Sequence, residues 1–78
     1  MPRLTVVHRH DCELCDEMVA ELRALARTQA LPPIEVVDVD SDPELRAEYG
    51  DRVPVIMIDG REHGFWKVEE ARFRAALS

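Results

Sequence analysis

The 78-residue sequence lacks the features that mark membrane proteins and nucleic-acid-binding proteins. No apolar run approaches the roughly 20 residues that a bilayer-spanning helix requires. Basic residues number 10 against 16 acidic residues, and a phosphate backbone would repel the resulting formal charge of −6. No apolar leader precedes the first strand-like run. We therefore expect a cytoplasmic protein that binds neither membranes nor nucleic acids.

The chain is also poor in cysteine, with only Cys12 and Cys15. A small secreted domain that relies on disulfides for stability uses more cysteines at wider spacing. A bridge across so short a loop would restrict the unfolded chain very little. The C-x-x-C pair is therefore predicted to serve chemistry, through catalysis, redox sensing or metal binding, rather than to stabilise the fold.

Three β-branched and apolar runs predict strands, at residues 4–7, 34–39 and 54–58. The dipeptide Asp59-Gly60 is a strong hairpin signal, so residues 61–65 are expected to return as a fourth strand.

Apolar periodicity and capping residues predict three helices. The first starts near Glu13 and stops before Pro32-Pro33, and its apolar face holds Cys15, Met18, Val19, Leu22, Leu25 and Ala26. The second starts with Asp42 as its N-cap and stops at Gly50. The third covers residues 68–77 and is expected to turn Val68, Ala71, Phe73 and Ala75 inward. The order β-α-β-α-β-β-α indicates one α/β domain over residues 1–78, with the first two strands parallel.

Cys12 directly follows the first predicted strand, and Cys15 lies in the first turn of the helix that comes next. A helix N-terminus carries a partial positive charge and unpaired backbone N–H groups, which favour a thiolate over a thiol. Cys12 is therefore the candidate nucleophile for disulfide exchange, although Asp11 beside it opposes the thiolate. Cys15, one turn further on, is placed to resolve the mixed disulfide.

Four features in this order resemble a glutaredoxin of the thioredoxin fold: a strand, Cys12-Glu13-Leu14-Cys15 opening a helix, Val53-Pro54 opening a later strand, and the Asp59-Gly60 hairpin. The short bacterial glutaredoxin-like proteins are the most similar. The resemblance implies a four-stranded mixed sheet of order 2-1-3-4 flanked by three helices, and a role in cell redox homeostasis. It also implies a cis Val53–Pro54 bond that presents the Val53 backbone to an extended substrate.

The resemblance further implies substrates and partners, namely protein or small-molecule disulfides and thiols, with glutathione as a candidate co-substrate. Arg9 and Arg52 are the candidate ligands for its carboxylates. Gly64 matches the first of the family's paired glycines, but Phe65 stands in place of the second and Trp66 follows, which predicts weak glutathione binding. We expect a monomer that needs no metal and no organic cofactor.

Two other functions remain open from the sequence. His8, His10, Cys12 and Cys15 lie within eight residues and are all competent ligands, so the chain is alternatively a metal-binding module. Because fold does not fix function, it is alternatively a non-catalytic interaction domain on a thioredoxin scaffold.

Overall fold

Strand β1 (Leu4–His8) occupies the interior of a four-stranded sheet in the computed structural model, which describes residues 2–77. It pairs in parallel with β2 (Ile34–Asp38) and antiparallel with β3 (Val55–Ile58), and β3 pairs antiparallel with β4 (Arg61–Phe65). The strand order β2-β1-β3-β4 confirms the mixed 2-1-3-4 sheet predicted for the thioredoxin fold.

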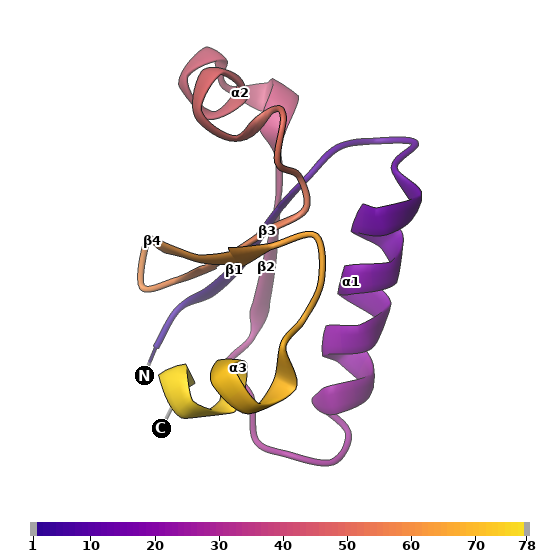
Figure 1. Cartoon of the computed structure of the whole chain (residues 1–78), viewed down its shortest axis with the longest axis vertical. Coiled ribbons are helices and arrows are strands. Elements are labelled where there is room, and N and C mark those ends of the chain that lie inside the picture. The colour runs from indigo at the N-terminus through magenta and orange to yellow at the C-terminus, as the bar shows by residue number, and fades with distance from the viewer. Residues whose placement is uncertain (1, 78) are drawn as a thin grey trace.

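The main core lies between one face of this sheet and two helices, α1 (Glu13–Leu25) and α3 (Glu70–Leu77) (Figure 1). Apolar side chains at alternate strand positions point to this face, as period-two strands require. The buried side chains of the main core are Leu4, Val6, Met18, Leu22, Ile56 and Phe73. The core therefore ties the start of the chain to its last helix.

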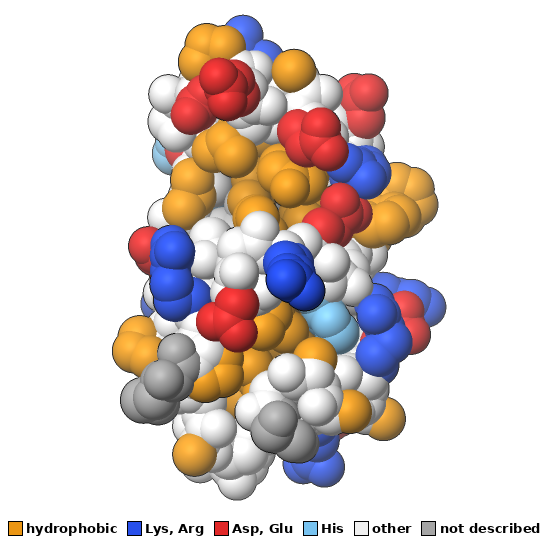
Figure 2. All heavy atoms as spheres, turned by 90° about the vertical axis from the view of Figure 1, so that its left-hand side faces the viewer, with side chains coloured by type: hydrophobic (Ala, Val, Ile, Leu, Met, Phe, Trp, Pro, Cys, Tyr) orange, Lys and Arg blue, Asp and Glu red, His pale blue; other side chains and the backbone are white. Residues whose placement is uncertain are grey.

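The opposite face of the sheet is covered only in part, by α2 (Pro43–Tyr49). Val7, Val39 and Val55 are buried there, and Leu45 and Tyr49 of α2 pack against them. Figure 2 shows hydrophobic side chains still visible below α2, among charged side chains of both signs. The second core is thus smaller than the first.

Capping explains where α2 begins and ends. The Asp42 side chain accepts a hydrogen bond from the Glu44 N–H at 2.8 Å, Pro43 is the first helical residue, and Gly50 is the C-cap. These boundaries confirm the sequence prediction. By contrast, α1 ends at Leu25, and Ala26 is an exposed C-cap rather than part of the buried face. The Thr28 side chain bonds the Leu25 carbonyl, an alternative to continuing the helix.

The second strand is one residue shorter than predicted. It stops at Asp38 because that side chain accepts a hydrogen bond from the Asp40 N–H at 2.9 Å and starts a short 3-10 helix, η1 (Val39–Ser41). Val39 is nevertheless fully buried, although the prediction that it continues the strand is wrong.

The prediction for the last helix was partly wrong. Helix α3 starts at Glu70, so Val68 precedes it while still packing on the main core. Phe73 is buried, but Ala71 and Ala75 are exposed. Two residues along a helix correspond to a rotation of about 200°, so positions two before and two after Phe73 face away from the sheet.

The turn between β3 and β4 has the backbone that its sequence predicts. Asp59 and Gly60 both have positive φ, at 53° and 78°. A two-residue hairpin turn of type I′ requires positive φ at both of its central residues. The β3–β4 register is irregular between Ile56 and Met57, which pair with Gly64 and Glu62 respectively. Within residues 2–77 no helix has both the length and the apolar character to cross a membrane.

The core position of Phe73 leads to a stability prediction. Phe73→Ala should lower the free energy of unfolding by about 3–5 kcal/mol, because it leaves a cavity between α3 and the sheet. Phe73→Leu should cost about 1–2 kcal/mol and provides the measurement if the alanine variant does not fold. Urea denaturation gives these values. Ala71→Ser, on the exposed side of the same helix, is the control, and an equal loss there would contradict the assigned packing.

Candidate functional site

The two cysteines lie at the start of α1, where the chain leaves β1 and turns into the helix. They form a disulfide with their Cα atoms 5.2 Å apart. Cys15 is completely buried, whereas Cys12 is partly exposed. An external sulfur can therefore approach Cys12 and not Cys15.

The sulfur of Cys12 also caps α1. Cys12 is the N-cap residue, with extended backbone, and its Sγ accepts a hydrogen bond from the Cys15 N–H at 3.1 Å. Serine, threonine or aspartate usually supplies this acceptor, through an oxygen. In the reduced protein the same N–H donor and the positive end of the helix dipole favour a negative charge on this sulfur.

The residue before Cys12 has an unusual backbone. Asp11 is exposed and has φ of 56°, in the left-handed region that asparagine and aspartate enter more readily than most residues. This conformation turns the chain from β1 toward α1. It also leaves a carboxylate beside the candidate nucleophile, where it opposes a thiolate.

Val53 and Pro54 lie at the same end of the sheet as the cysteines. The antiparallel register pairs Val7, shortly before the cysteine loop, with Val55, which follows Pro54. The Val53–Pro54 peptide bond is cis. Val53 lies outside the sheet, and in the described part of the chain its N–H and C=O form none of the observed backbone hydrogen bonds.

The Pro54 carbonyl, in contrast, is already used. It accepts a hydrogen bond from the Trp66 N–H at 2.9 Å, which attaches the end of β4 to the start of β3. Trp66 has φ of 72°, a rare conformation for so large a residue. Its ring meets the Phe65 ring edge to face, with 5.1 Å between centroids. The two aromatic residues therefore form a fixed corner.

A groove of about 740 Å³ runs from this corner to Leu14 at the start of α1. Its apolar wall consists of Leu14, between the two cysteines, together with Phe65 and Trp66. These three side chains are 50%, 41% and 53% exposed, which is unusual for large apolar residues in a molecule this small. The remaining lining is Glu62, His63, Gly64, Lys67, Glu69 and Arg72.

The imidazole of His63 adds no charge to the groove at neutral pH. Burial lowers the pKa of His63, and the nearby Arg72 guanidinium lowers it further, while Glu69 acts in the opposite direction. Arg72 itself donates a hydrogen bond to the His63 carbonyl. The groove therefore combines an apolar wall with the charged side chains of Glu62, Lys67, Glu69 and Arg72.

Both arginines singled out in the sequence have partners within the protein. Arg9 bonds Asp40 and the Gly50 carbonyl. Arg52 bonds Glu62 at 3.2 Å and the Glu48 carbonyl at 2.7 Å, and its guanidinium lies 5.4 Å from the centre of the Tyr49 ring.

The candidate metal ligands do not converge. His8 and His10 stack edge to face at 5.7 Å, and His10 lies 3.4 Å from a carboxylate oxygen of Asp38. Over residues 2–77 no three His, Cys, Asp or Glu side chains are grouped so as to hold a metal ion. The arrangement therefore gives no support to the metal-binding alternative built on His8, His10, Cys12 and Cys15.

Two residues of this region were not identified from the sequence. The sequence signal for Leu14 is that it is a large apolar residue off the buried face of the helix, which predicts an exposed contact. Asp40 was missed because it lies 31 residues from Arg9, and no local pattern links them.

Comparison with known proteins agrees with this geometry. The family model described as Glutaredoxin-like domain (DUF836) matches residues 3–78. An uncharacterized protein of Mycobacterium tuberculosis is 37% identical over 82 residues, which cover 99% of this chain and 84% of that protein. The solution structure of protein Ne2328 from Nitrosomonas europaea superposes with a TM-score of 0.86 at 33% identity, covering 99% of this chain and 92% of that one.

A more distant match extends the fold assignment. The thioredoxin of Fasciola hepatica superposes with a TM-score of 0.65 at 22% identity, over 97% of this chain and 77% of its own. At that identity the likeness concerns the fold alone, which is the thioredoxin fold already evident from the sheet order. With the family model matched over almost its entire length, the chain belongs to the glutaredoxin-like domain family.

Proposed function

We propose that the protein is a thiol–disulfide oxidoreductase that exchanges disulfides through Cys12 and Cys15. One observation carries the proposal: a partly exposed sulfur caps a helix and is bonded to a completely buried one. The exposed member is the attacking group and the buried member the resolving group. The family fold and the spacing of the pair support the same chemistry.

The reaction proceeds in two exchanges from the reduced protein. The Cys12 thiolate attacks one sulfur of a substrate disulfide, so a mixed disulfide forms and the first substrate thiolate leaves. Cys15 then loses its proton and attacks Cys12 Sγ, which releases the second substrate thiolate and forms the Cys12–Cys15 disulfide. The two substrate thiolates take up two protons from solvent, which balances the proton that Cys12 lost on forming its thiolate and the one that Cys15 loses. Two external thiol groups, from two monothiols or one dithiol, reduce the protein for the next cycle and are themselves joined in a disulfide.

The Val53 backbone supplies the second contact for an extended substrate. Its N–H and C=O are available for hydrogen bonds, so a peptide can add to this end of the sheet as a short extra strand. The peptide's cysteine would then lie against Cys12. A small disulfide has no backbone to offer and depends on Cys12 alone.

Glutathione is expected to be a poor co-substrate. It carries two carboxylates and a free amino group, and a specific site needs charged partners for all three. Arg9 and Arg52 are already bonded within the protein. Phe65 and Trp66 fill the place where glycines would let the backbone approach. The absence of three hydrogen bonds or ion pairs, at roughly 1 kcal/mol each, corresponds to about a hundredfold weaker binding.

Cysteine replacement tests the assigned roles. Cys12→Ser should abolish reduction of a disulfide-bonded peptide, whereas Cys15→Ser should retain the first exchange and accumulate a mixed disulfide. Mass spectrometry of the intact protein detects that adduct. If the reverse pattern appeared, the roles would be exchanged. If the wild-type pair formed a disulfide but turned over no substrate, the chain would instead be a non-catalytic interaction domain.

The carboxylate next to Cys12 gives a prediction about reactivity. Asp11→Asn keeps a residue that tolerates the left-handed backbone and removes the charge that opposes the thiolate. The reduced variant should react with iodoacetamide at pH 6 about threefold faster than the wild type. Glu17→Gln, on the exposed side of α1, is the charge-matched control and should change the rate little. Equal acceleration in both variants would mean that the net charge of the protein, and not the nearness of Asp11, controls the reactivity of the Cys12 sulfur.

The aromatic corner gives a prediction about glutathione. Trp66→Gly suits the positive φ and removes one of the two aromatic side chains that crowd the place of the missing glycine at Phe65. Turnover of a glutathionylated peptide with glutathione as reductant should rise about tenfold from a low wild-type rate. Leu14→Ala removes apolar surface from the same groove without opening that place, and should not raise it. Robust wild-type turnover with glutathione would contradict the expectation that glutathione is a poor co-substrate.

A further inference from the structure

The side chain of Arg9 joins three segments that are distant in the sequence. Its Nε and Nη2 donate to the two carboxylate oxygens of Asp40, at 3.1 and 3.3 Å, and its Nη1 donates to the Gly50 carbonyl at 3.1 Å. Two parallel bonds to one carboxylate fix the plane of the guanidinium, which a lysine could not do. One side chain therefore connects the cysteine loop, η1 and the end of α2.

These segments lead to the two parts of the proposed site. Arg9 precedes Cys12 by three residues, and Gly50 precedes Val53 by three residues. The hydrogen bond between Arg9 and Gly50 thus directly links the loop that carries Cys12 to the loop that carries Val53. Asp40, in η1, is the third segment that Arg9 joins. It also forms an ion pair with Arg46, whose Nε lies 3.4 Å from Asp40 Oδ1.

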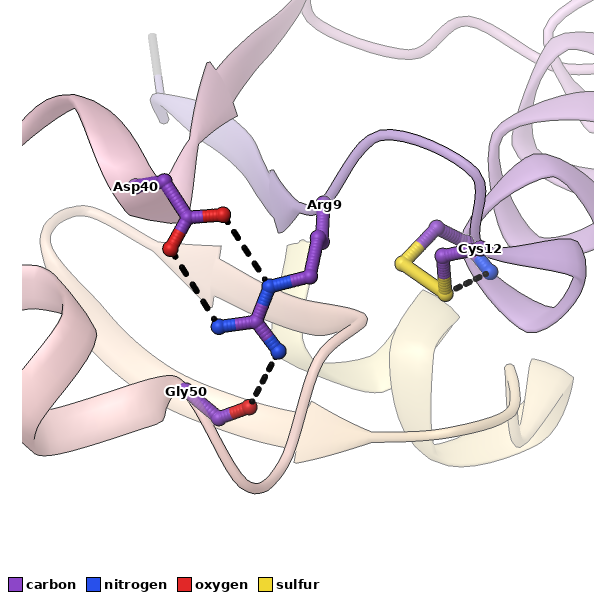
Figure 3. The surroundings of a disulfide bond; sticks show 5 residues. Arg9, Cys12, Asp40 and Gly50 are labelled. Atoms are coloured by element: carbon purple, nitrogen blue, oxygen red, sulfur yellow. Dashed lines mark hydrogen bonds and ion pairs between the residues drawn. A yellow bond between two sulfur atoms is a disulfide. The ribbon is translucent and has the colours of Figure 1, made fainter.

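Arg9 is not arranged to act on the sulfur directly. Figure 3 shows its guanidinium directed toward Asp40 and Gly50, away from the disulfide. The hydrogen bond between the two side chains raises the pKa of Arg9 and lowers the pKa of Asp40, so both stay charged at neutral pH. The charge of Arg9 is balanced by Asp40, which leaves geometry as the main contribution of this residue.

We infer that Arg9 is a positioning residue that fixes the separation between Cys12 and the Val53 backbone. The inference rests on the proposed function, because it concerns substrates that engage both loops at once. An extended peptide must reach Cys12 with its sulfur and Val53 with its backbone. A small disulfide touches only Cys12 and is indifferent to the separation. Arg9 thereby favours peptide disulfides over small ones.

The test compares two substrates with the same leaving group. One is 2-hydroxyethyl disulfide, and the other is a ten-residue peptide whose single cysteine is disulfide-bonded to 2-mercaptoethanol. Arg9→Met should raise the KM for the peptide about tenfold while kcat/KM for the small disulfide stays within about twofold, since a misplaced backbone contact affects only the larger substrate. Arg9→Lys should recover only part of the peptide KM.

Arg46→Met is the matched control, because it also removes a cation from Asp40, while the Arg46 backbone carbonyl that accepts the Gly50 N–H stays in place. It should leave both substrates near wild-type values. If Arg9→Met does not fold, Asp40→Asn provides the same comparison by removing the charge that orients Arg9.

Three results would overturn the inference. Equal losses for both substrates would make Arg9 a general structural or electrostatic residue. An equal effect of Arg46→Met would assign the role to the charge near Asp40. Unchanged kinetics with the peptide in Arg9→Met would show that Arg9 does not position the site. Failure of the wild-type protein to reduce either substrate is a different outcome, because it rejects the proposed function itself.

Discussion

The first turn of an α-helix must find acceptors for backbone N–H groups that have none within the helix. In α1 one of these acceptors is the sulfur of Cys12, and the donor is the N–H of Cys15. The residue that ends the loop after β1 is thus a structural cap and, in the proposed function, also the attacking group. Its partner, one turn along the helix, is buried, so the same helix geometry separates an accessible sulfur from an inaccessible one.

The substrate side of the site comes from elsewhere in the chain. The β1–β3 register brings Val53 and Pro54 to the end of the sheet where the cysteines lie, and the bond from Trp66 to Pro54 adds the end of β4. The sheet and the cysteine helix belong to the thioredoxin fold in general. The aromatic corner departs from the glutaredoxin pattern, because Phe65 stands where that pattern leads one to expect the second glycine, and Trp66 follows it. In the proposed function, reaction type and substrate preference are therefore governed by different segments.

Features with a local cause were predicted well from the sequence. Asp42 and Pro43 start a helix, and Asp59 and Gly60 make a tight turn, because each acts on its own neighbours. Strand order also followed, once the position of the cysteine pair indicated the family. The inward direction of Ala71 and Ala75 was wrong because small apolar residues tolerate either side of a helix, and the buried Phe73 decides its orientation. The partners of Arg9 could not be predicted, since they depend on the completed chain path.

The left-handed backbone at position 11 limits which residues can occupy it. Glycine, asparagine and aspartate adopt this conformation at low cost, whereas β-branched and bulky residues do not. Of these three residues, only aspartate places a negative charge beside the nucleophile. The genetic code connects aspartate to each of the other two by a single base change. The reactivity of this sulfur is consequently open to evolutionary adjustment through substitutions that keep the loop in its present shape.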